Sequence, residues 1–104
     1  MDSAISARHG TLTPDAHDYI QKKLPKLVHL HDKVQSVQVT VDFSAHGPEV
    51  ELVVTEPHRQ FVAKEAQPTV QAAFDNALAK LEGQLRKHKE KLQEHHSGVD
   101  KHAR

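Results

Sequence analysis

Alternating apolar and polar side chains mark the middle of this chain as a set of β-strands. At residues 37–43 every odd position is valine or phenylalanine and every even position is polar. This two-residue period is typical of a strand with one face on a core and the other in water. The same alternation recurs more weakly elsewhere, and together the patterns predict four strands, at residues 3–8, 37–43, 50–54 and 60–65.

A helix is predicted between the first two strands, where apolar side chains recur every three to four residues. It begins at Thr13, whose hydroxyl is a suitable N-cap, with Pro14 at the first helical position and a carboxylate at Asp15. Its apolar side continues to about His31. Pro25 lies in its interior and would cost about 3 kcal/mol in a straight helix, so we expect a kink or a break there.

A longer helix is predicted after the Gln67-Pro68-Thr69 segment and continues to about His95. At 100° per residue, one side of this helix is apolar and carries Val70, Phe74, Ala77, Leu78, Leu81, Leu85, His88 and Leu92. We expect His88 to pack at the edge of the core. Residues 1–96 are therefore predicted to form one domain, and residues 97–104 a flexible C-terminal tail.

The order of these elements, β-α-β-β-β-α, predicts an α+β sandwich. Two amphipathic helices need an apolar surface to cover, and one face of a four-stranded sheet supplies it. The first two strands should be parallel, because a helix connects them, and the later strands should pair as antiparallel hairpins. The other sheet face, which bears Gln38, Asp42, Glu49 and Glu51, should be open to water.

The charge of the chain is balanced in total but uneven along its length. Fourteen lysines and arginines match fourteen acids, which argues against a generic nucleic-acid binder. However, residues 20–33 hold four lysines and one acid, and residues 80–91 hold five cations and two acids. Residues 42–75 hold six acids and two cations. Two basic helices beside an acidic middle segment could orient the protein on a polyanion.

The cations of the second helix fall on different sides of it. Lys80, Lys87 and Lys91 form a row beside the apolar side, while Arg86 and Lys89 point elsewhere around the outer surface. Such a row could lie along a phosphate backbone, but periodicity alone favours the alternative that the lysines only keep an amphipathic helix soluble. Tyr19 of the first helix is expected to be partly buried against the sheet, with stacking on an RNA base as the alternative.

Several classes of function find no support in the sequence. The chain has no cysteine, no apolar run of membrane-spanning length and no export signal, so we expect a soluble protein that is not exported. No spacing resembles a nucleophile elbow, a phosphate loop or a zinc motif, which disfavours an enzyme. Of the ten histidines, His29 with His31 and His95 with His96 are candidate metal pairs. Helical neighbours two apart diverge by about 200°, so no metal or cofactor is expected.

Several short motifs together resemble the ribosome hibernation-promoting factors. This family is also known as the ribosome-associated translation inhibitors and as sigma-factor modulation proteins. The similarity covers about residues 1–96 and is most specific in the Lys-His-Lys-Glu-Lys run at 87–91. It also includes the Thr13-Pro14 helix start, Lys23-Leu24-Pro25-Lys26-Leu27, Ala72-Ala73-Phe74-Asp75, Lys80-Leu81 and Gln84-Leu85-Arg86.

This resemblance implies both a fold and a role. Family members share the β-α-β-β-β-α sandwich, which is similar to double-stranded-RNA-binding domains. They occupy the decoding channel of the small ribosomal subunit, contact its rRNA through basic helices and inhibit translation during stress or stationary phase. The RNA-binding residues expected here are Lys22, Lys23, Lys26, Lys80, Arg86, Lys87, Lys89 and Lys91. The implied setting is the bacterial cytoplasm, with no small-molecule substrate and no membrane partner, and with a monomer away from the ribosome.

The chain also departs from the family pattern. Gly83 stands where relatives often carry a basic residue, Gln71 replaces a common tyrosine, and Pro25 replaces a helix former. The chain ends near Arg104, without the extra domain with which long members join two ribosomes, so a role in ribosome pairing is not implied. A second function stays open, that of a protein-binding transcription regulator that uses the acidic sheet face, as the older family label suggests.

Overall fold

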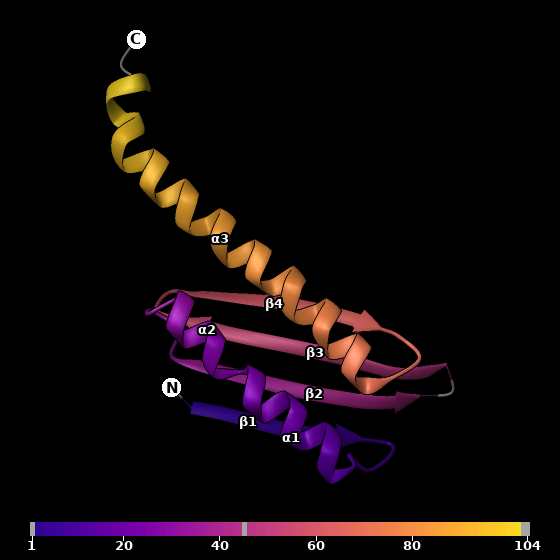
Figure 1. Cartoon of the computed structure of the whole chain (residues 1–104). Helices are drawn as coiled ribbons and strands as arrows, with labels where there is room; N and C mark the ends of the chain where they lie inside the picture. Colours follow the sequence, from indigo (N-terminus) through magenta and orange to yellow (C-terminus); the bar gives the residue numbers. More distant parts are fainter. Residues whose placement is uncertain (1, 45, 103–104) are drawn as a thin grey trace.

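A computed structural model describes residues 2–44 and 46–102, with side chains described for residues 2–27, 29, 31–44 and 46–90. The order of the elements confirms the predicted β-α-β-β-β-α sandwich, with the first helix in two pieces (Figure 1). The elements are β1 (Asp2–Arg8), α1 (Pro14–Lys23), α2 (Pro25–Leu30), β2 (Ser36–Ser44), β3 (Gly47–Glu56), β4 (Arg59–Ala66) and α3 (Val70–His102).

The four strands form one sheet in the order β1-β2-β3-β4. Strand β1 runs parallel to β2, with Ile5 opposite Val39, and the β2–β3 and β3–β4 pairs are antiparallel. Both predicted modes of pairing are therefore confirmed. The β3–β4 hairpin closes through two residues, Pro57 and His58, and His58 has a left-handed backbone with φ of 67°. This hairpin lies at the same end of the sheet as the beginning of β2.

The first helix breaks at Pro25, as its sequence predicts. Proline has no backbone N–H to donate and its ring crowds the preceding turn, so α1 ends at Lys23 and α2 begins at Pro25. Leu24 between them keeps a helical backbone, and its N–H donates to the Ile20 carbonyl at 3.1 Å. Leu24 and Leu27 are both buried, so the break leaves the apolar side of both pieces on the sheet.

The core lies between one face of the sheet and the helices (Figure 1). The buried face of the sheet is lined by alternate residues of β2 and β3, including Val39, Val41 and Leu52, while α3 contributes Phe74 and Leu81. Burying each of these side chains contributes about 1.5–3 kcal/mol. Among the residues that the structure describes, no polar or charged residue is buried. The described lysine and arginine side chains are consequently all at least partly exposed.

Helix α3 is longer than the sequence predicts. The Thr69 hydroxyl accepts the N–H of Ala72 at 3.1 Å at its beginning, and the helix continues to His102, where an end near His95 was expected. Residues 96–102 contain no proline, and extending an existing helix is easier than starting one. At 1.5 Å per residue its 33 residues span about 50 Å, and its C-terminal part projects beyond the sheet (Figure 1).

The predicted flexible tail at residues 97–104 stays a prediction, and residues 103–104 lie outside the described part of the chain. Within the described residues, no helix combines the length and the apolar character that crossing a membrane requires.

Candidate nucleic-acid interface

Helices α1 and α3 are joined by a polar contact between their facing sides. The Lys23 ammonium donates to Oδ1 of Asp75 at 3.1 Å and to the hydroxyl of Tyr19 at 2.8 Å. That hydroxyl donates in turn to Oδ2 of Asp75 at 2.7 Å. The hydrogen bond that Lys23 donates to Tyr19, followed by the one it donates to Asp75, raises the pKa of Lys23. Lys23, one of the predicted RNA-binding residues, is therefore already engaged within the protein.

Tyr19 is half-buried, as the sequence predicts, but its neighbour is helix α3 as well as the sheet. Its ring meets Phe74 edge to face, with the centroids 6.3 Å apart, and the Lys23 ammonium lies 4.5 Å from the Tyr19 ring centroid. This packing and the hydroxyl contacts occupy both the ring and the polar end of the side chain. Stacking of Tyr19 on an RNA base would require breaking these contacts.

Lys22 and Lys26 are exposed on α1 and α2. The buried side of these helices is defined by Ile20, Leu24 and Leu27, and helical spacing places the two lysines away from it. Their ammonium groups are therefore presented on the outer side of the first helical layer.

The cations of α3 lie on two opposite flanks of the helix. On one flank, Lys80 donates to Oε2 of Glu65 at 3.0 Å, and the Gln84 amide donates to the Val62 carbonyl at 3.0 Å. This flank therefore lies along strand β4, and helical spacing places Lys87 on it as well. Lys80 and Lys87 thus point away from α1 and α2, and Lys91, the third member of the predicted row, lies outside the described side chains.

The opposite flank of α3 faces the end of the first helical layer. Arg86, Lys89 and Glu82 line a hollow together with His31, the residue that follows α2. Lys89 also lines a neighbouring hollow with His31 and Lys33. Arg86 and Lys89, which appear isolated on a helical wheel, are thus the cations of α3 that meet the other helices.

Helical spacing does not identify Lys33 and Arg59 as members of this basic region, since neither lies in a helix. Lys33 belongs to the segment between α2 and β2, and Arg59 begins β4 directly after the hairpin turn. Both line a hollow that His88 of α3 completes. The excess of lysine over residues 20–33 could have pointed to Lys33. No pattern in the sequence indicates that Arg59 lies beside α3.

His88 packs at the edge of the core, as predicted. Its ring lies 5.4 Å from that of Phe61 on β4, at an angle of 59°. His31, the other half of the candidate pair with His29, is partly buried. Among the described residues there is no group of three or more histidine, cysteine or acidic side chains that could hold a metal ion. His95 and His96, the second candidate pair, lie outside the described side chains.

The outer sheet face is less acidic than the sequence suggests. Lys64 lies 3.9 Å from Glu49 and 4.0 Å from Glu51, and His9 Nδ1 lies 2.8 Å from Oδ1 of Asp42. Strand register also places Arg8 opposite Asp42. Acids and cations therefore alternate on this face, so it does not present a continuous negative patch.

Comparison with known proteins places these features in a family. A family model described as Sigma 54 modulation protein / S30EA ribosomal protein matches residues 4–93. A ribosome hibernation promoting factor of Pseudomonas putida is 34% identical over 93 residues, covering 89% of this chain and 91% of the relative. One of Azotobacter vinelandii with the same description is 31% identical over 98 residues, covering 94% of this chain and 92% of the relative.

Two solved structures share the fold. A ribosomal subunit interface protein from Coxiella burnetii superposes with a TM-score of 0.79 at 20% identity, covering 86% of this chain and 98% of that one. The N-terminal domain of Thermus thermophilus Protein Y superposes with a TM-score of 0.73 at 26% identity, covering 85% and 99%. The architecture described above is therefore shared across nearly the whole length of both structures.

Proposed function

The chain belongs to the Sigma 54 modulation protein / S30EA ribosomal protein family, and we propose that it is a ribosome-binding hibernation factor that inhibits translation. The observation that carries the proposal is the presence of exposed cations on neighbouring helices that cover one face of the sheet. Relatives with ribosome hibernation names cover about nine-tenths of the chain, which supports the same reading.

In this proposal the protein occupies the decoding channel of the small ribosomal subunit. The basic helices would contact rRNA, with Lys22 and Lys26 from the first layer and Arg86, Lys87 and Lys89 from α3. Lysine and arginine neutralise phosphates and release condensed counterions, so binding should weaken as salt rises. Lys80 and Lys91 belong to the same predicted set, and Lys80 would have to exchange Glu65 for a phosphate.

Lys23 enters the proposal in a different role from the other cations. Its ammonium already has two partners, Tyr19 and Asp75, which a phosphate would have to displace or share. We therefore assign Lys23 mainly to holding α1 against α3, so that the cations around it keep their spacing. We assign direct contact with RNA to the exposed lysines and arginine of the preceding set.

Inhibition by this route requires no catalysis. A folded domain that fills the space used by messenger and transfer RNA excludes them sterically, and its affinity rests on backbone charge and shape because the edges of bases in A-form RNA are hard to reach. The proposal therefore includes no substrate and no cofactor. It places the protein with bacterial ribosomes in the cytoplasm, as a monomer when unbound.

The test is co-sedimentation with purified small ribosomal subunits. Arg86→Gln combined with Lys89→Gln should greatly reduce the fraction of protein that pellets at low salt. The matched control is Arg8→Gln combined with Lys64→Gln, which removes the same charge from the outer sheet face and should pellet like the wild type. Equal pelleting of both variants would contradict the assigned interface, and absence of pelleting by the wild type would contradict the function.

The second candidate function, regulation of a transcription factor through the sheet face, is favoured only by Asp42, Glu49 and Glu51 on that face. Their cationic neighbours weaken the case. This alternative predicts that Glu49→Lys with Glu51→Lys abolishes the function while the Arg86 and Lys89 changes leave it intact. The proposed function predicts the reverse.

A further inference from the structure

Three adjoining hollows gather at one end of the molecule, where α2 ends, the β3–β4 hairpin turns and α3 leaves the sheet. The first, of about 230 Å³, shares His31 and Lys89 with the second hollow between α2 and α3. It also shares Lys33, Glu56 and His88 with a third hollow that reaches the hairpin. The three hollows therefore form one continuous site, which we call the histidine end.

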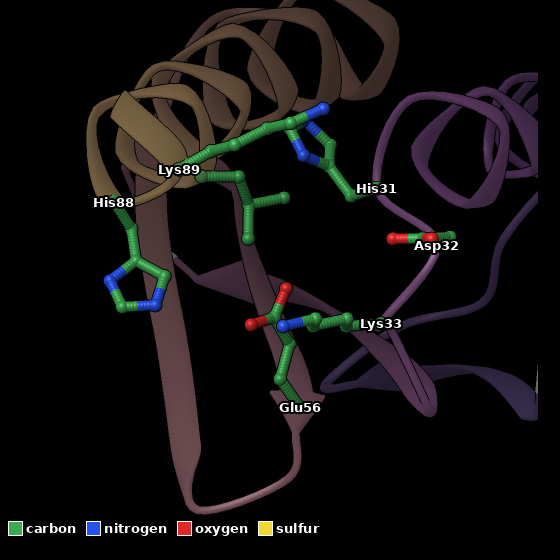
Figure 2. Close-up of a pocket in the computed structure, with 7 residues that line it drawn as sticks. His31, Asp32, Lys33, Glu56, His88 and Lys89 are labelled. Carbon is green, nitrogen blue, oxygen red and sulfur yellow. The ribbon is translucent and has the colours of Figure 1, made fainter. Parts of the chain in front are cut away.

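The close-up of the first hollow shows how the side chains of this site are arranged (Figure 2). His88 enters from α3 on one side, and His31 enters from the end of α2 on the other. Lys89 extends across toward His31, while Lys33 and Glu56 point toward one another below. Leu85 adds an apolar side chain to the lining. The imidazole rings of His31 and His88 therefore line the cavity from two sides, and the ammonium groups of Lys33 and Lys89 line it as well.

The charge of the histidine end depends on its imidazoles. The lining holds four permanent cations, Lys33, Arg59, Arg86 and Lys89, and three acids, Asp32, Glu56 and Glu82. It also holds three histidines, His31, His58 and His88. With neutral imidazoles the cations exceed the acids by one, and with all three imidazoles protonated the excess is four. Histidine is the side chain whose charge responds to pH in the physiological range, so the charge of this end depends on pH.

The groups that face His31 come from each neighbouring element. Lys89, Arg86 and Glu82 face it from α3, Glu56 from β3, and Asp32 and Lys33 follow it in the loop. Partial burial, and then the positive charge of Lys89, lowers the pKa of His31. An anion placed among these cations would act in the opposite direction, because it favours the protonated imidazole. Anion binding and protonation of His31 should therefore assist each other.

His88 sits among a similar mixture of charges. Phe61 of β4 packs against its ring. Lys33, Asp32 and Glu56 share its hollows from the α2–β2 loop and β3, and Arg59 and His58 do so from the hairpin. Its neighbours along α3 are Lys87 and Lys89. Protonation here adds charge to a surface that already has a slight excess of cations.

We propose that the histidine end is a phosphate-binding subsite for RNA, and that its affinity increases as pH falls because its imidazoles become charged. The choice of RNA as the ligand rests on the proposed function. Acidification would then tighten binding to an RNA backbone without any change of fold. The proposal gives three of the ten histidines of the chain, His31, His58 and His88, a role in RNA binding.

The test measures binding of the full chain to a fluorescein-labelled RNA stem-loop at constant ionic strength, at pH 7.6 and pH 5.8. Wild-type protein should bind roughly tenfold more tightly at the lower pH, as expected for adding positive charge near phosphates. His31→Gln with His88→Gln should lose most of this gain, measured as the ratio of the variant's own affinities at the two pH values. The matched control is His46→Gln, since His46 lies in the β2–β3 turn at the opposite end of the sheet.

Replacing His88 with glutamine could damage the fold, so two further variants are included that test the proposal independently. His58→Asn keeps a residue that tolerates the left-handed backbone and should lose part of the gain. His31→Arg with His88→Arg should bind tightly at both pH values, because its charge is permanent. An unchanged pH effect in the glutamine variant, or no pH effect in the wild type, would overturn the proposal.

Failure of this subsite and failure of the proposed function give different results. If the glutamine variant keeps the full pH effect on RNA while small subunits still bind the protein, the subsite is overturned and the function stands. If the pH effect on RNA requires His31 and His88 but no small subunits pellet, the subsite is supported and the ribosomal function is not.

Discussion

The ammonium of Lys23 lies 3.1 Å from a carboxylate oxygen of Asp75, across the contact between α1 and α3. The two residues are 52 positions apart in the chain, and each is only partly exposed. This pair, together with the Tyr19 hydroxyl, links two helices that carry predicted RNA-binding cations. The contact lies between the helices and is partly exposed.

Tyr19→Phe tests the contribution of that contact to stability. The variant keeps the ring against Phe74 but removes the hydroxyl that donates to Asp75 and accepts from Lys23. We expect a loss of about 1 kcal/mol in the free energy of unfolding, measured by urea denaturation. A loss above about 3 kcal/mol would indicate that ring packing had also failed, and no loss would show that water replaces the hydroxyl.

Gly83→Ala should stabilise the protein. Gly83 lies inside α3, and an added Cβ would have no atom within 4 Å outside its own helix. Alanine is favoured over glycine in a helix by about 0.5–1 kcal/mol, and nothing in the surroundings opposes the gain. Thermal unfolding followed by circular dichroism should show a higher midpoint. A lower midpoint would mean that this part of α3 is not helical in solution.

Gly10→Ala provides the opposite case. A Cβ at Gly10 would lie 2.7–2.9 Å from three atoms of the Phe43 side chain, closer than real Cβ atoms approach. The Phe43 ring would have to shift from its place against the core, at a cost of about 1–3 kcal/mol. The same unfolding assay should therefore give a lower midpoint. An unchanged midpoint would show that the β1–α1 loop adjusts freely.

Acid should destabilise the protein through His31 when no anion is present. The pKa of His31 is lowered in the folded protein, so the unfolded chain takes up this proton first as pH falls below about 6.5. The contribution of His31 to the free energy of unfolding is therefore fully present above pH 6.5 and is lost as pH falls through the lower, folded pKa. Urea denaturation at pH 7.5 and pH 5.5 in an anion-poor buffer measures this loss.

His31→Gln should show a smaller loss between the two pH values than the wild type, while His46→Gln should lose as much as the wild type. Equal losses in all three proteins would show that other groups determine the acid response. This experiment differs from the RNA-binding test because the unliganded protein is examined, where the protonated imidazole has no phosphate to face.

Removing interface cations should reduce the salt dependence of binding to small subunits. Each phosphate contact contributes about one unit or slightly less to the slope of log affinity against log salt. Arg86→Gln with Lys89→Gln should therefore lower the magnitude of the slope by about one to two units. Arg8→Gln with Lys64→Gln should leave it unchanged, and a lowered slope in that control would indicate a general effect of net charge.

The sequence predicts the fold of this chain well because its signals are local. The valines of β2, the Thr13-Pro14 helix start and the break at Pro25 each act through immediate neighbours, and each is found where expected. The end of α3 is the exception. Glycine and histidine near residues 95–98 are weak stop signals, and no proline follows them.

The candidate site is less predictable because it depends on which segments meet. Helical spacing correctly separates Lys80 and Lys87 from Arg86 and Lys89, but it does not reveal that the second pair faces the end of α2. It also does not reveal that Lys23 finds its partner in Asp75. Both facts follow from the crossing of α3 over the sheet, which brings together residues that are more than fifty positions apart.

The contact between Gln84 and the Val62 carbonyl has a consequence for how copies of this protein behave when crowded. An unpaired edge strand can recruit the edge of another molecule and begin aggregation. The amide of Gln84 occupies one acceptor on the outer edge of β4, and α3 lies along that strand. The other edge, β1, carries the charged residues Asp2 and Arg8 at its ends. We therefore expect the sheet to resist edge-to-edge growth even when the protein accumulates.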